Sequence, residues 1–303
     1  MNARRRKGEW LEWTVKRDVH SIEDIREELV ETIGGRFLSK LNRSGGIQWK
    51  GRRVMLRLFP EETLQYEPEW ADIEVLYEDD FSLVVNKPPG MKVHPTREGE
   101  SGTLLHALGW HLESTGQRCR PRPIHRLDED TTGPVLAAKN EWAQYRLDEA
   151  MRDKRVERIY VALVQGHPSD NSGMIDAPIG RDRHHATRRR VSRTGDAAVT
   201  RYEVLERLRS ASLVRLRLET GRTHQIRVHM SHLGHPLLGD LLYGGRAAGM
   251  ARQALHGDVL MFPEPLTGER VQVRAPWPED FAALYEQLKK IVVMLLPQQP
   301  YKL

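Results

Sequence analysis

The sequence predicts an α+β fold in which a small module precedes one larger domain. Strand-like segments outnumber helix-like ones, and the two kinds do not alternate regularly along the chain. Regular alternation is typical of a parallel sheet covered by helices, so this order favours an antiparallel or mixed sheet instead. An acidic, proline-containing stretch from Pro60 to Trp70 has the composition of a linker. We therefore expect a module with its linker at residues 10–69 and a larger domain at residues 70–303.

The module is predicted to contain two helices and a β-hairpin. Ser21–Ile33 carries isoleucine and leucine at helical spacing, and the serine and two acidic residues at its start are typical of a helix N-terminus. Two glycines end this helix, a short helix is expected around Phe37–Leu41, and a hairpin is expected at residues 47–58. This order, with scattered lysines and arginines, resembles an S4-type RNA-binding module. A helical cap that only packs on the larger domain is the alternative.

The larger domain is predicted to combine many strands with a few helices, because short apolar runs bounded by turn residues outnumber segments of helical periodicity. The expected strands are Ile73–Tyr77, Ser82–Asn86, Val135–Ala138, Glu157–Val164, Ala198–Leu205, Ser212–Glu219, Gln253–Met261 and Arg270–Ala275. The expected helices are Thr103–Glu113, Glu141–Arg152, Thr223–Leu233 and Glu279–Ile291.

The composition is that of a soluble globular protein. Of the 303 residues, 39% are hydrophobic and 29% are charged. No apolar run approaches the roughly 20 residues that span a bilayer, and the start of the chain lacks the apolar stretch of a signal peptide. The single Cys119 can form neither an internal disulfide nor a cysteine zinc cluster. We therefore expect a cytoplasmic protein that does not associate with membranes.

Positive charge is concentrated in one short segment. The formal net charge of +5 permits a polyanionic partner without requiring one. Between Arg181 and Arg193, however, six arginines are accompanied by a single acidic residue, Asp182. Arginine pairs bidentately with phosphate oxygens. This segment is therefore either a phosphate-binding surface or a solvated basic loop.

The common signatures of nucleotide, dinucleotide and zinc-protease sites are missing from the sequence. We therefore expect no cofactor and no metal. One alternative stays open, because His224, His229, His232 and His235 are spaced so that two of them could bind a metal from one helix face.

The densest polar motif is His-Arg-Leu-Asp-Glu-Asp-Thr-Thr-Gly at residues 125–133, which leads into the apolar strand Val135–Ala138. Loops held on a rigid sheet are the usual carriers of catalytic groups. By composition alone, a surface loop with local ion pairs is an equal alternative.

Residues 125–133 resemble the active-site motif His-Arg-Leu-Asp-x-x-Thr-x-Gly of a family of RNA pseudouridine synthases that act on ribosomal and transfer RNA. Further blocks resemble the same family in the same order, namely Asn86–Pro95, Arg158–Gly166 and Gly221–His229, the last followed by Gly234-His235-Pro236, Gly239-Asp240 and Tyr243-Gly244. The resemblance extends from about residue 73 to about residue 288. It implies the catalytic fold of that family for the larger domain.

The resemblance also implies roles for individual residues. Asp128 corresponds to the family's catalytic aspartate, which either attacks the sugar of a flipped-out uridine or removes a proton from it. Arg227 corresponds to the arginine that pairs with this aspartate, and a carboxylate in a water-poor pocket needs such a cation. Tyr160 corresponds to a tyrosine that lies against the base and is suited to proton transfer. Arg126 is implied to enter the gap that the base leaves in the RNA.

The sequence therefore predicts an RNA pseudouridine synthase that isomerises specific uridines in structured RNA. We expect large-subunit ribosomal RNA as substrate, because family members with an S4-like module favour it, and transfer RNA is the alternative. Arg188, Arg189 and Arg190 are expected to hold RNA phosphates, and the protein is expected to be a monomer. Two other classes remain: a glycoside hydrolase that uses a carboxylate pair such as Asp128 and Asp130, and a non-catalytic RNA-binding protein.

Overall fold

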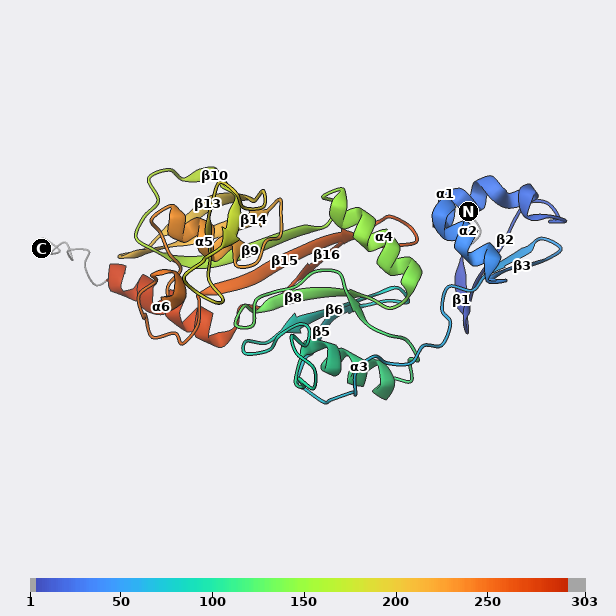
Figure 1. The fold of residues 1–303 in the computed structure, drawn as a ribbon, viewed down its shortest axis with the longest axis horizontal. Helices are drawn as coiled ribbons and strands as arrows, with labels where there is room; N and C mark the ends of the chain where they lie inside the picture. The colour runs from blue at the N-terminus through green and yellow to red at the C-terminus, as the bar shows by residue number, and fades with distance from the viewer. Residues whose placement is uncertain (1–3, 294–303) are drawn as a thin grey trace, which may run out of the picture.

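The chain folds into an elongated molecule in which a small N-terminal module adjoins a larger α+β domain (Figure 1). The computed structural model describes residues 4–293. Within that range, every pair of neighbouring strands in the sheets is antiparallel. The predicted α+β class is thus confirmed, and of the two sheet types that were expected the antiparallel one is observed.

The larger domain is built on two sheets and a short two-stranded ribbon. The sheets have the strand orders β10-β13-β14-β9-β15-β16 and β5-β6-β8-β7, and β11 pairs with β12 in the ribbon. The strands are β5 (Glu74–Glu78), β6 (Ser82–Lys87), β7 (Arg122–Pro123), β8 (Gly133–Ala138), β9 (Glu157–Gln165), β10 (Ser172–Asp176), β11 (Ile179–Arg181), β12 (Arg189–Val191), β13 (Val199–Arg207), β14 (Ala211–Leu218), β15 (Leu255–Pro263) and β16 (Arg270–Arg274). The helices are α3 (Leu104–Ser114), α4 (Glu141–Arg152), α5 (Gln225–His232) and α6 (Glu279–Val293), with a 3-10 turn at Leu241–Tyr243.

Strand β8 is buried on both faces because a helix covers each side. Val135 and Ala137 belong to the apolar cluster that contains the leucines of α3. Leu136 and Ala138 point the other way, as alternate residues of a strand must, and belong to the cluster that contains α4. The motif loop that precedes β8 is therefore anchored to a strand that is buried along its whole length.

The two sheets meet where the start of β8 crosses β15. Thr132 forms a bridge with His256, and the backbone N–H of Gly257 donates to the carbonyl of Thr132 at 2.8 Å. Gly133 has a φ of +124°, and a Cβ at this position would lie 2.5 Å from the carbonyl oxygen of Gly257. Only glycine tolerates this conformation and this close approach. The last residue of the motif thus determines how the loop enters the sheet.

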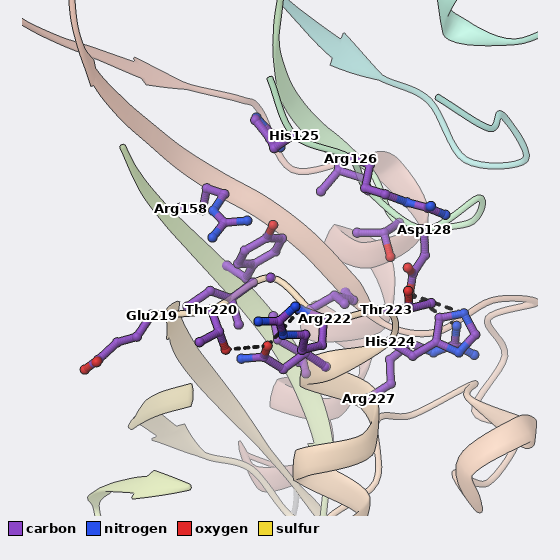
Figure 2. A pocket seen from close by; sticks show the side chains of 18 of the residues that line it. His125, Arg126, Asp128, Arg158, Glu219, Thr220, Arg222, Thr223, His224 and Arg227 are labelled. Atoms are coloured by element: carbon purple, nitrogen blue, oxygen red, sulfur yellow. Dashed lines mark hydrogen bonds and ion pairs between the residues drawn. The ribbon is translucent and has the colours of Figure 1, made fainter. Parts of the chain in front are cut away.

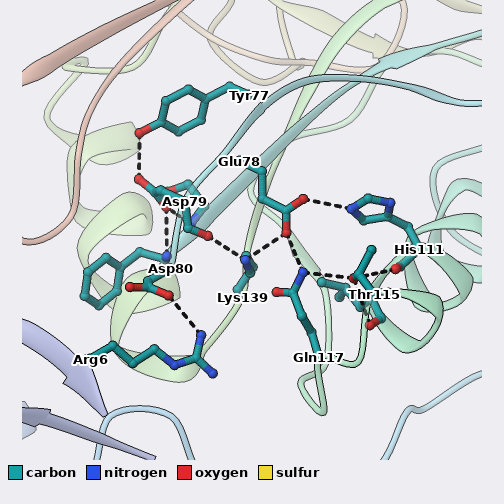
Figure 3. A network of polar contacts seen from close by, with 12 residues as sticks. Arg6, Tyr77, Glu78, Asp79, Asp80, His111, Thr115, Gln117 and Lys139 are labelled. Carbon is teal, nitrogen blue, oxygen red and sulfur yellow. Dashed lines mark hydrogen bonds and ion pairs between the residues drawn. The ribbon is translucent and has the colours of Figure 1, made fainter. Parts of the chain in front are cut away.

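The N-terminal module shares a hydrophobic core with the larger domain. It contains β1 (Arg5–Lys7), β2 (Trp10–Thr14), a 3-10 turn (Ile22–Ile25), α1 (Arg26–Ile33), α2 (Gly35–Arg43), β3 (Ile47–Lys50) and β4 (Arg53–Leu56). The ring of Phe81 lies 5.2 Å from the ring of Phe59 and 5.2 Å from that of Trp142, so aromatic side chains of both parts pack against one another. An ion pair of 3.0 Å between Arg6 and Asp80 adds a polar contact (Figure 3).

Beside this contact, a polar network ties strand β5 to helix α3 (Figure 3). The carboxylate of Glu78 accepts hydrogen bonds from Lys139 at 2.9 Å and from Gln117 at 2.8 Å, and it lies 2.8 Å from Nε2 of His111. Burial by itself raises the pKa of Glu78, but these hydrogen bonds outweigh burial and hold the pKa at about 2. The Glu78 carboxylate is therefore ionised at neutral pH.

Several short strands were not predicted. Strands β1 and β2 precede the expected helices, and β7, β10, β11 and β12 have two to five residues each. Glycine, proline and arginine interrupt apolar runs in most of these strands, so the sequence gives no strand signal there. None of the helices in the described part of the chain is long and apolar enough to cross a bilayer.

Candidate active site

A pocket of about 330 Å³ lies where the motif loop, strand β9 and the start of α5 meet. Asp128, Tyr160 and Arg227 all line it, although they are far apart in the sequence. Figure 2 shows Asp128 and Arg227 at this pocket. A volume of this size is within the range of small-ligand sites. Asp130, the example given for a second carboxylate in the hydrolase alternative, is exposed and is not among the residues that line the pocket.

The loop that carries Asp128 is held by buried cations beneath it. Lys87 is 0% exposed, and its ammonium donates to three backbone carbonyls, including that of Glu129 at 2.7 Å. Burial lowers the pKa of Lys87 to about 7, but three carbonyl acceptors use all three N–H groups and so favour the charged form. Arg252 donates to the carbonyl of Asp130 at 3.0 Å. The position of Asp128 is therefore set by hydrogen bonds to the backbone carbonyls of the two residues that follow it, Glu129 and Asp130.

Arg227 joins two carboxylates. Its Nη1 lies 3.3 Å from Oδ2 of Asp128, while Nε and Nη2 donate to the two oxygens of Asp240 at 2.7 and 2.9 Å. The side chain of Asp240 is 1% exposed and that of Asp128 is 18% exposed. Burial would lower the pKa of the Arg227 guanidinium, but the hydrogen bonds and charge of Asp240, together with the charge of Asp128, raise it. Asp240 thus anchors the cation, and Asp128 remains partly free to face the pocket.

His224 lies next to the same carboxylate, just before α5. It adopts the left-handed conformation with φ +58°, which is strained for a residue with a side chain. Its Nε2 lies 3.9 Å from Oδ2 of Asp128, and its Nδ1 lies 2.8 Å from the hydroxyl of Tyr243. Burial lowers the pKa of His224 despite the charge of Asp128, so the ring is neutral at neutral pH.

The hydrogen bonds of Tyr243 indicate which nitrogen of His224 carries the hydrogen. The hydroxyl of Tyr243 accepts from the backbone N–H of Arg189 at 2.9 Å, so its own hydrogen is available to Nδ1 of His224. The remaining hydrogen of the neutral imidazole is then on Nε2, which faces Asp128. The Tyr243 ring also lies under the guanidinium of Arg227, at 5.0 Å. Tyr243 therefore orients both neighbours of the carboxylate.

Tyr160 presents its hydroxyl to the pocket from β9. The residue is 4% exposed, and burial raises the pKa of its phenol. Among the described residues, no group hydrogen-bonds to this hydroxyl. Arg158, two residues earlier on the same strand, also lines the pocket, and its Nε is buried without a partner. At neutral pH, Tyr160 is thus a protonated group that can donate to a ligand, with a cation beside it.

His125 and Arg126 differ in their surroundings. His125 is buried, its Nε2 accepts from the backbone N–H of Leu136 at 3.2 Å, and burial lowers its pKa to about 3. It is a neutral structural residue. Arg126 is exposed at the wall of the pocket, next to Asp128 in Figure 2. The structure therefore leaves the Arg126 guanidinium free to contact a bound molecule.

The basic segment is a ribbon, not an unstructured loop. Arg189 and Arg190 lie on β12, and Arg188 precedes it. Arg188 is neutralised by Asp182, with 2.6 Å between Nη2 and Oδ2. Arg190 is exposed, whereas Arg189 is half-buried. The three arginines that were predicted together therefore have three different environments.

The histidines near α5 bond to different groups. The two ring nitrogens of His229 lie 2.9 Å from Thr200 Oγ1 and 2.9 Å from the carbonyl of Ala177. Nδ1 of His235 lies 2.9 Å from the carbonyl of Gln165. Within residues 4–293, no group of three or more histidine, cysteine or acidic side chains is placed to hold a metal ion.

Comparison with known proteins identifies the family. A model of the RNA pseudouridylate synthase family matches residues 81–232. An uncharacterised RNA pseudouridine synthase of Bacillus subtilis is 40% identical over 284 residues, which cover 91% of this chain and 92% of the relative. The chain belongs to the RNA pseudouridylate synthase family. The ribosomal large subunit pseudouridine synthase D of Haemophilus ducreyi is 39% identical, over 82% of this chain and 81% of the relative.

Solved structures of this pseudouridylate synthase family have the same fold. The human RNA pseudouridylate synthase domain containing 1 superposes with a TM-score of 0.60 at 29% identity, and covers 77% of this chain and 99% of that structure. The corresponding human domain-containing protein 4 superposes with a TM-score of 0.59 at 26% identity, over 71% of this chain and 92% of that structure. The matches confirm the family and the catalytic fold that the sequence predicted.

The structure brings together the four residues that resemblance assigned to this pseudouridylate synthase site, and it adds others. No sequence pattern indicated Asp240 as the main partner of Arg227, or Tyr243 as the hydrogen-bond partner of His224. Their segments were recognised only as Gly-Asp and Tyr-Gly pairs of the family. A carboxylate that follows an arginine by thirteen positions becomes its partner only through the tertiary fold.

Proposed function

We propose that this pseudouridine synthase acts on uridines of large-subunit ribosomal RNA, and that Asp128 acts on the ribose of a uridine held in the pocket. The substrate proposal rests on relatives, because the curated protein of Haemophilus ducreyi carries this RNA in its name. Transfer RNA is the alternative substrate. The proposal for Asp128 rests on one observation: its carboxylate lines a nucleoside-sized pocket and is held 3.3 Å from a buried arginine.

The reaction needs no external reagent. The bond between C1′ and N1 of the uridine breaks, a bond between C1′ and C5 forms, and the proton on C5 is exchanged for one on N1. Atoms and electrons balance within the nucleotide and the solvent, so no metal, nucleotide or organic cofactor is required. Asp128 starts this sequence either by attacking C1′ or by removing a proton from the ribose. Arg227 places a positive charge 3.3 Å from the carboxylate of Asp128 in both routes.

Tyr160 and Arg126 have complementary roles in this proposal. The phenol of Tyr160 is protonated and without a partner, so its ring can lie against the extruded base and its hydroxyl can donate a proton or hydrogen bond. Arg126 is exposed at the pocket, where it can occupy the gap in the RNA stack. Extrusion of a base costs a few kcal/mol of stacking, and a side chain that fills the gap offsets part of this cost.

We also propose that the N-terminal module and the arginines near β12 hold the RNA while the larger domain performs the reaction. An S4-like role for the module remains a proposal, and a cap that only stabilises the domain is the alternative. The shared aromatic core of Phe59, Phe81 and Trp142 is compatible with both. The protein is proposed to work as a monomer in the cytoplasm, where ribosomal RNA is modified.

The substrate is tested by mapping pseudouridines in total RNA from cells with and without this protein. The proposal expects one or more sites in large-subunit ribosomal RNA to disappear and to return when the protein is supplied again. Loss of sites in transfer RNA alone would replace the proposed substrate with the alternative. An unchanged map of all RNA would contradict the proposal.

A further inference from the structure

A second cavity lies directly beside the active-site pocket. It measures about 400 Å³ and is enclosed by the β11–β12 ribbon, the turn at residues 194–196 and the loop at residues 221–223. The two cavities share Gly221, Arg222 and Thr223 as lining residues. A ligand that fills the pocket and extends beyond it therefore reaches this second cavity across a single loop.

The lining of the second cavity is unusually basic for its size. Arg181, Arg189 and Arg222 line it, and the only acidic residue among its lining is Asp196. The side chain of Asp196 is 75% exposed and lies 3.8 Å from Arg222. The charges of the lining residues therefore sum to an excess of positive charge, which a bound anion would neutralise.

Two of these arginines face each other across the ribbon. Arg181 and Arg189 are paired in the register of β11 and β12, so their side chains project from the same face. Like charges at directly opposed positions destabilise a ribbon. In the part of the chain that the structure describes, neither side chain has a carboxylate partner, and Nε of Arg189 is buried without an acceptor. The nearby Asp182 is already paired with Arg188.

We propose that this cavity binds a backbone phosphate of the substrate RNA, adjacent to the uridine in the pocket. This rests on the proposed function, because it takes RNA as the molecule that fills the first pocket. A phosphodiester carries the negative charge that would compensate the two opposed arginines. Its oxygens also suit their planar guanidinium groups. The phosphate fixes where the RNA strand enters the site but does not read its sequence. It is thus a positioning contact for the target uridine.

The matched variants are Arg189→Gln and Arg209→Gln. Arg189→Gln removes the charge but keeps the backbone N–H that holds Tyr243. Arg209 is exposed in the turn before β14, whereas the cavity lies beyond the other end of that strand. The probe is a labelled single-stranded oligonucleotide that contains one uridine, and its dissociation constant is measured over a range of salt concentrations.

The proposal expects Arg189→Gln to weaken binding about tenfold and to make the slope of log affinity against log salt less steep by about 0.7, the value for one phosphate contact on a single strand. Arg209→Gln should change neither. Arg189→Lys, which keeps the charge but loses the planar fork, should keep the slope and recover only part of the affinity. An unchanged slope for Arg189→Gln, or an equal change for Arg209→Gln, would overturn the proposal.

Two further measurements locate the contact and identify its source. Neutral methylphosphonates replace single phosphates of the oligonucleotide, one at a time, around the uridine. At one of these positions the replacement should lower the affinity of the wild type and leave the affinity of Arg189→Gln unchanged. If inorganic phosphate binds the wild type through Arg189 while the RNA slope is unchanged, the cavity is a free-anion site and the RNA assignment is wrong. Pseudouridine formation by the wild type is measured separately, so failure of the proposed function is distinguishable from failure of the phosphate site.

Discussion

Replacement of Arg227 by methionine should both destabilise the protein and lower its activity. The variant leaves two carboxylates without their cation. Asp240 is 1% exposed and loses two hydrogen bonds of 2.7 and 2.9 Å, so the cost of breaking a buried ion pair, about 3–5 kcal/mol, applies to it. Asp128 is 18% exposed and loses one contact of 3.3 Å, which adds about 1 kcal/mol or less.

The loss of activity follows from the same geometry. Nη1 of Arg227 lies 3.3 Å from Oδ2 of Asp128, so the variant leaves the proposed reacting carboxylate without this cation. Tritium release from RNA that contains 5-tritiated uridine records the loss of activity, and urea unfolding at neutral pH records the stability loss.

A double variant separates the structural role of Arg227 from its role beside Asp128. In Arg227→Met/Asp240→Leu no unpaired carboxylate is left buried at position 240. Apolar residues often replace a buried ion pair with little loss of stability. Most of the lost stability should return, whereas the activity should not. Full activity in Arg227→Met would refute this reasoning. Recovery of activity in the double variant would show that Arg227 acts only through Asp240.

Three further outcomes are expected. Tyr243→Phe removes the hydroxyl that fixes the ring of His224, so nitrogen-15 NMR should show a mixture of imidazole tautomers in place of one, with an activity loss of about tenfold; a single tautomer with full activity would contradict the assignment. Because the pKa of Glu78 is held at about 2, below its ordinary value of 4.5, its contribution to stability is present above about pH 4.5 and is lost as the pH falls towards 2. Lys139→Met should therefore lower stability by about 1–2 kcal/mol at neutral pH and by less at about pH 3, as measured by urea unfolding; an equal loss at both would refute this. Activity should survive dialysis against a chelator, and a loss that zinc reverses would revive a metal site.

Much of the fold was predictable where periodicity is strong. Strands β6 and β9 and helix α4 were predicted to within one residue of their observed bounds, because each is an apolar run or a periodic segment between clear turn residues. Strand β1 is Arg5–Lys7, with every residue exposed, and β12 carries two arginines. Such strands form because a neighbouring strand offers backbone hydrogen bonds, and a local sequence pattern does not record this.

The site was predictable only in part, for a similar reason. Asp128, Tyr160 and Arg227 lie in dense sequence motifs, and resemblance to a family assigned them to one site. Asp240 and Tyr243 are part of the same site, but their partners are defined by the crossing of separate segments in space. The difference between Arg188, paired with Asp182, and Arg189, unpaired at a cavity, depends likewise on the ribbon that the chain forms.

The most direct test of the central claim is the activity of Asp128→Asn. The amide is nearly isosteric with the carboxylate but is a poor nucleophile and a poor base, so RNA affinity should be kept, and stability should change by no more than about 1 kcal/mol. Tritium release from 5-tritiated uridine in a large-subunit ribosomal RNA transcript should fall to background, while the wild type releases tritium under the same conditions. Near-normal release by Asp128→Asn would remove this residue from the mechanism and contradict the account.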